Sequence, residues 1–274
     1  MWASEMAQRP FIKMHGLGND FIVFDARRQP LTLSAAQVRA LADRRTGIGC
    51  DQLIVIEPSD IATARARFWN CDGAEVAACG NGSRAVAAVL GGAATIETGG
   101  GLLAASADTG GATVDMGAPR FGWQDVPLAF AMDTDRLPLA WYGLAEPGAV
   151  SVGNPHVVFF VDDPDAVDLA TLGPRIEHDP VFPERVNVGV AAMHGRSTMK
   201  LRVWERGAGL TRACGTGAVA AVAAAQRRGL ADAAVSVDLP GGRLSIHRDA
   251  QGHLHMAGPA VVSFTGCVDP EQYQ

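Results

Sequence analysis

The sequence has 274 residues, a formal net charge of 23 − 29 = −6, 48% hydrophobic residues and 19% charged residues. It is too apolar to be intrinsically disordered, and its acidic balance argues against nucleic acid or an anionic membrane surface as a partner. The first ten residues lack the apolar core of a signal peptide, and the longest apolar stretch, 218–225, is far shorter than the roughly 20 residues that span a bilayer. We therefore expect a cytoplasmic protein.

Short strand-like runs dominate the chain, and several alternate between apolar and polar residues as half-buried strands do. They lie at 21–25, 52–57, 65–69, 113–116, 157–161, 187–191, 198–204, 235–239 and 244–247. Glycine-rich segments at 98–101, 109–111 and 240–242 predict hairpin turns. A helix is predicted over 35–45, because Ser34 and Gln37 have the spacing of a capping box.

Two other helical segments, 82–90 and 217–228, consist mostly of Ala and Val and have no polar face. A helix that is apolar all round is normally buried on every side, and small residues fit a helix enclosed by a curved sheet. We therefore predict an α/β (α+β) fold with two pseudo-symmetric repeat domains. Each would be a curved mixed β-sheet wrapped around a central apolar helix.

A single offset relates the two halves of the chain. Cys79-Gly-Asn-Gly and Cys214-Gly-Thr-Gly are 214 − 79 = 135 residues apart. The same offset separates three further pairs: Asn19 and Asn154, Gln52 and Asn187, and Asn70 and Glu205. Later the offset slips to 140, if Met116 is paired with Met256. These matches predict a duplicated domain, 1–124 with the tail 259–274 packing back on it and then 125–258, and an active site in the cleft between the two.

Five cysteines, an odd number without a CxxC pair, predict reduced thiols rather than disulfides or a zinc site. Cys79 and Cys214 each precede a predicted helix start, where the helix dipole and unpaired N–H groups stabilise a thiolate. We therefore expect the pKa of both thiols to lie below the reference value of about 8.5. Cys50, Cys71 and Cys267 are interpreted as packing residues.

Two opposed acid/base groups of similar pKa suit one reaction above others: removal of a proton from one face of a carbon and its return to the other face. The helix starts also offer backbone N–H groups to a carboxylate, from Gly80, Asn81, Gly215 and Thr216. The predicted substrate is an α-amino or α-hydroxy acid that is inverted at Cα without a cofactor. The polar residues that would hold the rest of it are Asn19, Gln52, Asn70, Asn154, Asn187, Glu205 and Arg206. Arg206 suits a second carboxylate.

Six segments together resemble diaminopimelate epimerase. They are KMHGLGNDFIVFD (13–25), GCDQLIVIEPS (49–59), NCDGAEVAACGNGSR (70–84), GNPHVVFFVDD (153–163), RVNVGV (185–190) and WERGAGLTRACGTGAVA (204–220). The match covers nearly the whole chain in the right order. The resemblance implies interconversion of LL- and meso-diaminopimelate without pyridoxal phosphate, on the route to lysine and peptidoglycan, by a cytosolic homodimer.

Position by position, the resemblance implies that Cys79 and Cys214 are the two acid/base cysteines and that the polar residues and helix starts named above contact the substrate. It also implies that His156 and Glu205 tune the cysteines. Residues 1–9 extend beyond the usual start of the family, and Phe264 stands where an interface tyrosine is expected. The histidines His247, His253 and His255 have the pattern of a surface strand pair, and no metal site is expected.

Three alternatives compete with this reading. Proline and hydroxyproline racemases share the two-cysteine design and a CGTG, but lack the GLGNDF and ERGAG elements. Gly215 to Ala220 fits the dinucleotide-binding pattern GxGxxA, with Asp238 as the acidic residue, but the preceding strand ends near Glu205, about nine residues too early. A non-catalytic amino-acid-binding protein would need no cysteines at the matched positions.

Overall fold

The computed structural model describes residues 8–273, so most of the predicted extension 1–9 lies outside the described residues. The described chain divides into two compact units. The first unit comprises 8–114 and 258–273, and the second unit comprises 115–257. Each is a mixed sheet with few helices, as the sequence predicts.

The first unit consists of nine strands, two α-helices and a short 3-10 helix among the described residues. In chain order they are β1 (Arg9–Gly16), β2 (Asn19–Asp25), α1 (Ala35–Ala42), β3 (Gln52–Glu57), β4 (Ala64–Asn70), β5 (Glu75–Val76), α2 (Gly80–Leu90), β6 (Gly92–Thr98), β7 (Gly101–Asp108), β8 (Gly111–Asp115), β19 (Val261–Val268) and a 3-10 turn at Pro270–Gln272. The strand order is β19-β1-β2-β3-β4-β6-β7-β8, with β5 paired to β4. The pairs β2–β3 and β4–β6 are parallel.

The second unit repeats this plan. Its elements are β9 (Ala140–Trp141), β10 (Leu144–Ala145), β11 (Gly148–Ser151), β12 (Pro155–Phe160), a 3-10 turn at Pro164–Ala166, α3 (Leu169–Glu177), β13 (Asn187–Met193), β14 (Thr198–Glu205), β15 (Gly209–Leu210), α4 (Gly215–Arg227), β16 (Ala234–Leu239), β17 (Gly242–Arg248) and β18 (Leu254–Gly258). The strand order is β11-β12-β13-β14-β16-β17-β18, with β12–β13 and β14–β16 parallel.

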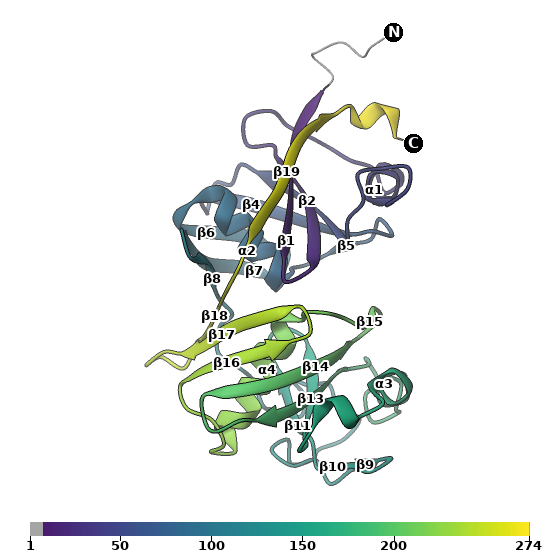
Figure 1. The fold of residues 1–274 in the computed structure, drawn as a ribbon, viewed down its shortest axis with the longest axis vertical. Helices are drawn as coiled ribbons and strands as arrows, with labels where there is room; N and C mark the ends of the chain where they lie inside the picture. Colours follow the sequence, from purple (N-terminus) through teal and green to yellow (C-terminus); the bar gives the residue numbers. More distant parts are fainter. Residues whose placement is uncertain (1–7, 274) are drawn as a thin grey trace. The chain divides into compact units, whose positions relative to one another are not determined.

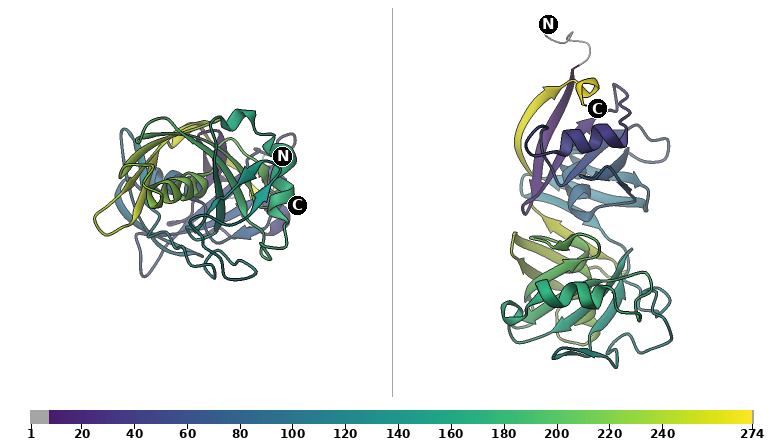
Figure 2. Two further views of the ribbon diagram at one scale, coloured as in Figure 1. Left: turned by 90° about the horizontal axis from the view of Figure 1, so that it is seen from below. Right: turned by 90° about the vertical axis from the view of Figure 1, so that its right-hand side faces the viewer.

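Each unit holds one apolar helix among its strands, which confirms the predicted central helix. The residues of α4 from Gly217 to Ala225 are all buried, and α4 contacts β11, β12, β13, β14 and β17 (Figure 1; Figure 2, left). In the first unit α2 contacts β1, β2, β3, β4, β6 and β7. Alanine and valine let these helices lie close to the strands, although α2 also buries the side chain of Arg84.

The strand registers give the repeat a structural basis. Phe21 pairs with Gln52 in the first unit and His156 pairs with Asn187 in the second, an offset of 135 at both positions. After the helix the offset changes: Ile96 is opposite Ala64, whereas Val237 is opposite Met199, and 237 − 96 = 141. The extra residues lie in a longer α4 and in the connection 228–233, where the first unit has only Gly91.

The predicted pairing of Met116 with Met256 is wrong. In the first unit Ala105 is opposite Val114, and in the second Ile246 is opposite Met256. The offset 246 − 105 = 141 makes Ile246 the counterpart of Ala105, so their strand partners, Met256 and Val114, are counterparts of each other. Both are fully buried. The two similar sequence segments around the methionines are out of register by two residues.

Helix α1 begins at its capping box, in which Gln37 N–H donates to Ser34 Oγ and the Gln37 side chain accepts from the Ser34 N–H. It ends three residues before the predicted end, where Asp43 Oδ1 accepts from Arg45 N–H and Thr46 N–H in a tight turn. Helix α3 has no counterpart in the sequence-based prediction. Its Pro174 is unfavourable inside a helix, and it is held by the Asp168 N-cap and by packing of Gly173 on Trp204.

Candidate active site

Both predicted helix-start cysteines are N-cap residues, as expected. Cys79 precedes α2 with extended backbone, and its Sγ accepts from Gly82 N–H at 3.3 Å. Cys214 precedes α4 in the same conformation, and its Sγ accepts from Gly217 N–H, also at 3.3 Å. Each sulfur therefore takes the place of the oxygen that usually caps a helix, beside the positive end of the helix dipole.

Glycine three residues after each cysteine allows the helix to approach the sheet. A Cβ at Gly82 would lie 2.9 Å from the Phe68 ring, and one at Gly217 would lie 2.9 Å from Val203 Cγ2 and 3.2 Å from Cys214 Sγ. The CGxG pattern thus has two roles: the cysteine caps the helix, and the second glycine lets the capped end pack against the strand behind it.

In the first unit the polar residues near Cys79 are joined to one another. Asn19, the first residue of β2, accepts at Oδ1 from Asn81 Nδ2 at 3.3 Å and donates from Nδ2 to Asp51 Oδ2 at 3.1 Å. Gln52 Nε2 donates to Asn70 Oδ1 at 2.9 Å, between the start of β3 and the end of β4. The fold therefore brings Asn19 to the first turn of α2 and fixes the orientation of its amide.

Behind Asn19 lies an ionic network that the sequence-based prediction missed. Asp20 receives hydrogen bonds from Lys13 and Arg44, and its carboxylate also accepts from Asp51 N–H at 3.0 Å. Burial alone would raise the pKa of Asp20, but the hydrogen bonds from Arg44 and Lys13 hold it below its usual range. Asp51 in turn accepts from Asp20 N–H and Asn19, so this network holds the start of β2.

The second unit repeats the arrangement around Cys214. Asn154 Nδ2 donates to Thr216 Oγ1 at 3.4 Å, and Asn154 Oδ1 lies 3.0 Å from His156 Nε2. Burial, together with the charge of Arg206, lowers the pKa of His156 to about 3, so the ring is neutral at pH 7. Because Asn154 Oδ1 is an acceptor, the proton of the neutral ring lies on Nε2.

Asn187, predicted as a substrate contact, is almost fully buried and joins two loops. Its Nδ2 donates to Pro155 O at 2.8 Å, and its Oδ1 accepts from Arg206 N–H at 2.9 Å. The guanidinium of Arg206 is exposed, and its Nη1 donates to Glu184 O at 2.9 Å. The side chain of Asn187 thus holds the main chain of Arg206, whose cationic end stays at the surface.

Glu205, the last residue of β14, and Cys214 shift each other's pKa. Glu205 Oε1 accepts from Thr211 Oγ1 at 2.5 Å. Burial raises the pKa of Glu205, and the Thr211 hydrogen bond and the Cys214 thiol oppose that rise. The sequence offset places Asn70, a neutral residue, at the equivalent position of the first unit.

The predicted lowering of the Cys214 pKa is wrong. Cys214 is only 3% exposed, and burial raises the pKa of its thiol well above the usual value. The Glu205 carboxylate raises it further, whereas Thr216 and the Gly217 N–H oppose the rise. The desolvation of a buried thiolate and the charge of the neighbouring carboxylate both raise the pKa of Cys214, and together they outweigh the helix dipole.

Of the three cysteines interpreted as packing residues, the structure supports that interpretation for Cys50 and contradicts it for Cys71 and Cys267. Cys50 is buried, and burial raises its pKa to about 12, whereas Cys71 and Cys267 are exposed. Cys71 lies in the turn after β4 and Cys267 on the outer side of β19. The histidines of the second unit are a surface strand pair as predicted, since His247 lies opposite His255.

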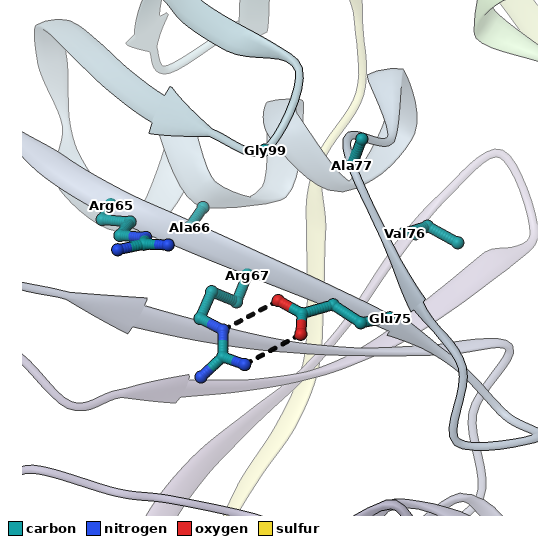
Figure 3. A pocket seen from close by; sticks show the side chains of 7 residues that line it. All are labelled: Arg65, Ala66, Arg67, Glu75, Val76, Ala77 and Gly99. Carbon is teal, nitrogen blue, oxygen red and sulfur yellow. Dashed lines mark hydrogen bonds and ion pairs between the residues drawn. The ribbon is translucent and has the colours of Figure 1, made fainter.

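A cavity of about 180 Å³ in the first unit is separate from these residues (Figure 3). Its lining consists of Arg65, Ala66, Arg67, Glu75, Val76, Ala77 and Gly99. The polar groups pair with one another: Arg67 Nε and Nη2 each donate to the Glu75 carboxylate at 2.8 Å. No predicted site residue lines this cavity, so it is not part of the candidate active site.

Within 8–273, no group of three or more His, Cys, Asp or Glu side chains is arranged to hold a metal ion. Among the helices of the same residues, none is long and apolar enough to cross a bilayer. The dinucleotide-binding alternative needs a strand that runs directly into the glycine turn. In the structure β14 ends at Glu205 and β15 intervenes before α4 begins at Gly215, which argues against it.

Two solved structures have the same fold as this chain. A PhzF-family phenazine biosynthesis protein from Enterococcus faecalis superposes with a TM-score of 0.69 at 14% identity, covering 95% of this chain and 99% of that one. A hydroxyproline epimerase from Agrobacterium vitis superposes with a TM-score of 0.66 at 15% identity, covering 97% and 94%. At these identities the likeness shows the fold alone: this chain has the fold of a PhzF-family protein and of a hydroxyproline epimerase.

The chain belongs to the diaminopimelate epimerase family, whose model matches residues 11–122 and 148–263. The diaminopimelate epimerase of Erythrobacter litoralis is 61% identical over 264 residues, which cover 96% of this chain and 98% of the relative. That of Zymomonas mobilis is 54% identical over 260 residues, covering 94% and 97%. These matches decide between the predicted families in favour of the epimerase over the proline racemases.

Proposed function

We propose that this protein is an isomerase that interconverts LL- and meso-diaminopimelate by a two-base mechanism without pyridoxal phosphate. The observation that carries the proposal is the pair of N-capping cysteines, Cys79 and Cys214, at equivalent positions of a repeated unit. It is supported by membership of the diaminopimelate epimerase family at up to 61% identity over nearly the full chain.

In the proposed reaction one cysteine is a thiolate and the other a thiol. The thiolate takes the proton from Cα, so its sulfur becomes a thiol and the electron pair of the C–H bond passes to Cα and the adjacent carboxylate. The second thiol then gives its proton to the opposite face of Cα and becomes the thiolate. Atoms and charge balance, and the two cysteines exchange roles with the direction of reaction. Both thiols must therefore reach one α-carbon from opposite faces.

The helix starts stabilise the charge that develops. Four residues of α2 and α4 would offer backbone N–H groups to the α-carboxylate: Gly80, Asn81, Gly215 and Thr216. Their donors are fixed before the proton leaves, so they stabilise the carbanion-like transition state more than the neutral substrate. The residues proposed to hold the rest of the molecule are Asn19, Gln52, Asn70, Asn154, Asn187, Glu205 and Arg206. No cofactor takes part in this scheme.

His156 and Glu205 act on the second cysteine in different ways in this proposal. Glu205 acts directly, through its charge, which raises the pKa of the Cys214 thiol. His156 acts indirectly: as a neutral donor to Asn154 it holds the side chain that bonds Thr216 in the first turn of α4. The reaction would serve lysine and peptidoglycan precursor synthesis in the cytoplasm.

We also propose a homodimer whose interface includes strand β19. Val261, Val262 and Phe264 are 42%, 54% and 50% exposed, an uncommon concentration of large apolar side chains on one edge strand. A Val262→Glu variant is expected to reduce the mass measured by light scattering to that of one chain. Ile61→Glu, at an apolar residue that is 67% exposed in a loop, is the control that leaves the mass unchanged.

The enzyme activity is tested by incubating the purified protein with LL-diaminopimelate in deuterium oxide. The expected product is meso-diaminopimelate with one deuterium at the inverted carbon, detected by mass spectrometry after chiral separation. Cys79→Ala and Cys214→Ala should each abolish the conversion while the circular dichroism spectrum stays unchanged. Retained activity in either variant overturns the two-base account, and conversion of proline but not of diaminopimelate overturns the assigned substrate.

A further inference from the structure

Thr211 is a residue outside the proposed catalytic set that contacts it directly. It follows β15 and precedes Cys214 by three residues, and its hydroxyl donates to Glu205 Oε1 at 2.5 Å. The charge of the carboxylate that accepts this hydrogen bond acts on the Cys214 thiol. The hydroxyl of a loop residue is therefore bonded to the carboxylate that acts on the sulfur at the start of α4.

The turn that carries Glu205 is fixed from a second side. Glu177, buried at the end of α3, accepts from Trp204 Nε1 at 2.7 Å and from Gly207 N–H at 3.0 Å. These bonds hold the Trp204 side chain before Glu205 and the main chain at Gly207 after it, but neither reaches the Glu205 carboxylate. The Thr211 hydroxyl supplies the hydrogen bond that fixes the carboxylate itself.

Comparison of the two units shows that the fold does not need a hydroxyl at the position of Thr211. Since 211 − 76 = 135, the counterpart of Thr211 is Val76, which has nearly the same shape. Val76 pairs with Phe68 on β4, and Thr211 N–H correspondingly bonds Val203 O on β14 at 3.4 Å. The hydroxyl of Thr211 and the carboxylate of Glu205 are thus both present in the second unit and both absent at the matched positions of the first.

The groups that act on Glu205 and Cys214 come from several elements of the second unit. Thr211 and Cys214 act on Glu205, and Glu205, Thr216 and the Gly217 N–H act on Cys214. The nearby cation, Arg206, has its guanidinium bonded to Glu184 O and acts on His156. A hydroxyl donor to a carboxylate favours its charged form, and the charged form is the one that raises the pKa of a nearby thiol.

We infer that Thr211 is a positioning residue for Cys214: its hydroxyl fixes the Glu205 carboxylate whose negative charge acts on the Cys214 thiol, and so keeps Cys214 protonated until substrate arrives. The inference rests on the proposed function, which gives Cys214 its part in proton transfer. Without the hydroxyl, Glu205 takes up a proton more readily and its negative charge near Cys214 falls, which leaves more thiolate at neutral pH.

The test compares Thr211→Val with Thr211→Ser, which keeps the hydroxyl. Methyl methanethiosulfonate at pH 7, followed by peptide mass spectrometry, measures the modification rate of Cys214 with Cys79 as the reference in the same sample. We expect Thr211→Val to raise the Cys214 rate about tenfold, as the loss of a charge-assisted hydrogen bond implies. Thr211→Ser should behave as the unchanged protein does. An unchanged rate in Thr211→Val, or an equal rise in Thr211→Ser, overturns the inference.

A second readout uses the epimerisation itself. In Thr211→Val the acid limb of the pH profile of kcat/KM should move up by about one pH unit, and Thr211→Ser should restore it. A purely structural role would lower the activity at every pH without moving the limb. If the unchanged protein does not epimerise diaminopimelate, the proposed function fails, but the thiol modification rates still decide the role of Thr211.

Discussion

Asn19 and Asn154 lie 135 residues apart, and each is bonded to the residue two places after the cysteine of its own unit. Asn81 Nδ2 donates to Asn19 Oδ1 at 3.3 Å, and Asn154 Nδ2 donates to Thr216 Oγ1 at 3.4 Å. The direction of donation is reversed between the two units. In both, however, the amide is held by a second partner, Asp51 in the first unit and His156 in the second. The two amides are therefore oriented before any substrate binds.

Removal of the Asp51 carboxylate should affect binding more than chemistry. Asp51→Ala leaves Asn19 Nδ2 without its acceptor and frees the amide to rotate, so we expect KM for diaminopimelate to rise about tenfold, with a smaller change in kcat. Arg44→Ala is the matched control, because it removes an exposed ion pair with Asp20 and Asp51 and leaves the Asn19 bond intact. Equal effects of the two variants on KM would contradict a role for Asp51 in orienting Asn19.

The buried neutral His156 makes the fold sensitive to acid. Its pKa is about 3 in the folded protein and about 6.5 in the unfolded chain, so between these values only the unfolded chain takes up the proton. The stability is complete above about pH 6.5 and is lost as the pH falls, at about 1.4 kcal/mol per unit, or about 2 kcal/mol at pH 5. Urea unfolding at pH 7.5 and pH 5 measures this loss.

His156→Gln is the control for that measurement. A glutamine amide donates to Asn154 as the ring Nε2–H does, but it does not titrate. Its free energy of unfolding should change much less between pH 7.5 and pH 5 than that of the unchanged protein. If the two proteins lose the same stability on acidification, the buried histidine is not the cause.

A methyl group at Gly82 or Gly217 should displace the cysteine three residues before it. The Cβ of Gly217→Ala would lie 2.9 Å from Val203 Cγ2 and that of Gly82→Ala 2.9 Å from the Phe68 ring. We expect each to lose about 1–3 kcal/mol in the free energy of unfolding through overpacking, and to lower kcat strongly. Gly110→Ala, in the exposed β7–β8 turn, should change neither. A fully active Gly217→Ala would show that the cap position of Cys214 is not critical.

Glu177 supports the turn between β14 and β15 from inside the second unit. Glu177→Ala leaves Trp204 Nε1 and Gly207 N–H without their acceptor in a partly buried place, which should cost about 1–3 kcal/mol in the free energy of unfolding. Glu146→Ala, which removes an exposed ion pair with Arg136, should cost less than about 0.5 kcal/mol. Chemical denaturation of the two variants makes the comparison, and similar losses would refute the role assigned to Glu177.

The features that the sequence predicted well are those with a local or periodic signal. The helix starts at Cys79 and Cys214 have glycine and alanine patterns of their own, and the offset of 135 aligned the two units without any coordinates. Helix α3 lacks a comparable signal, since Pro174 and Gly173 disfavour a helix, and it is held by the Asp168 N-cap together with packing on Trp204. The described part of the tail 259–274 lies with the first unit, as expected, but its pairing with β1 joins residues some 250 positions apart, and no local pattern predicts which strand it pairs with.

Electrostatic properties were harder to predict than positions. The N-cap position of Cys214 was correct, but its pKa depends on how completely the sulfur is buried and on a carboxylate brought in by another strand. Thr211 was missed because a single threonine in a loop has no distinctive spacing. The repeat did contain a signal for it: Val76 and Asn70 align with Thr211 and Glu205, so a polar pair stands where the first unit has none.

The return of β19 to β1 sets the order in which the protein is completed during synthesis. The second unit is continuous from 115 to 257, and all of it has been translated before the ribosome reaches Val261. The first unit, although it is translated first, lacks its last strand until that point, and β1 meanwhile presents an edge with unpaired backbone groups. The half of the molecule that begins the chain is therefore the half that finishes folding last.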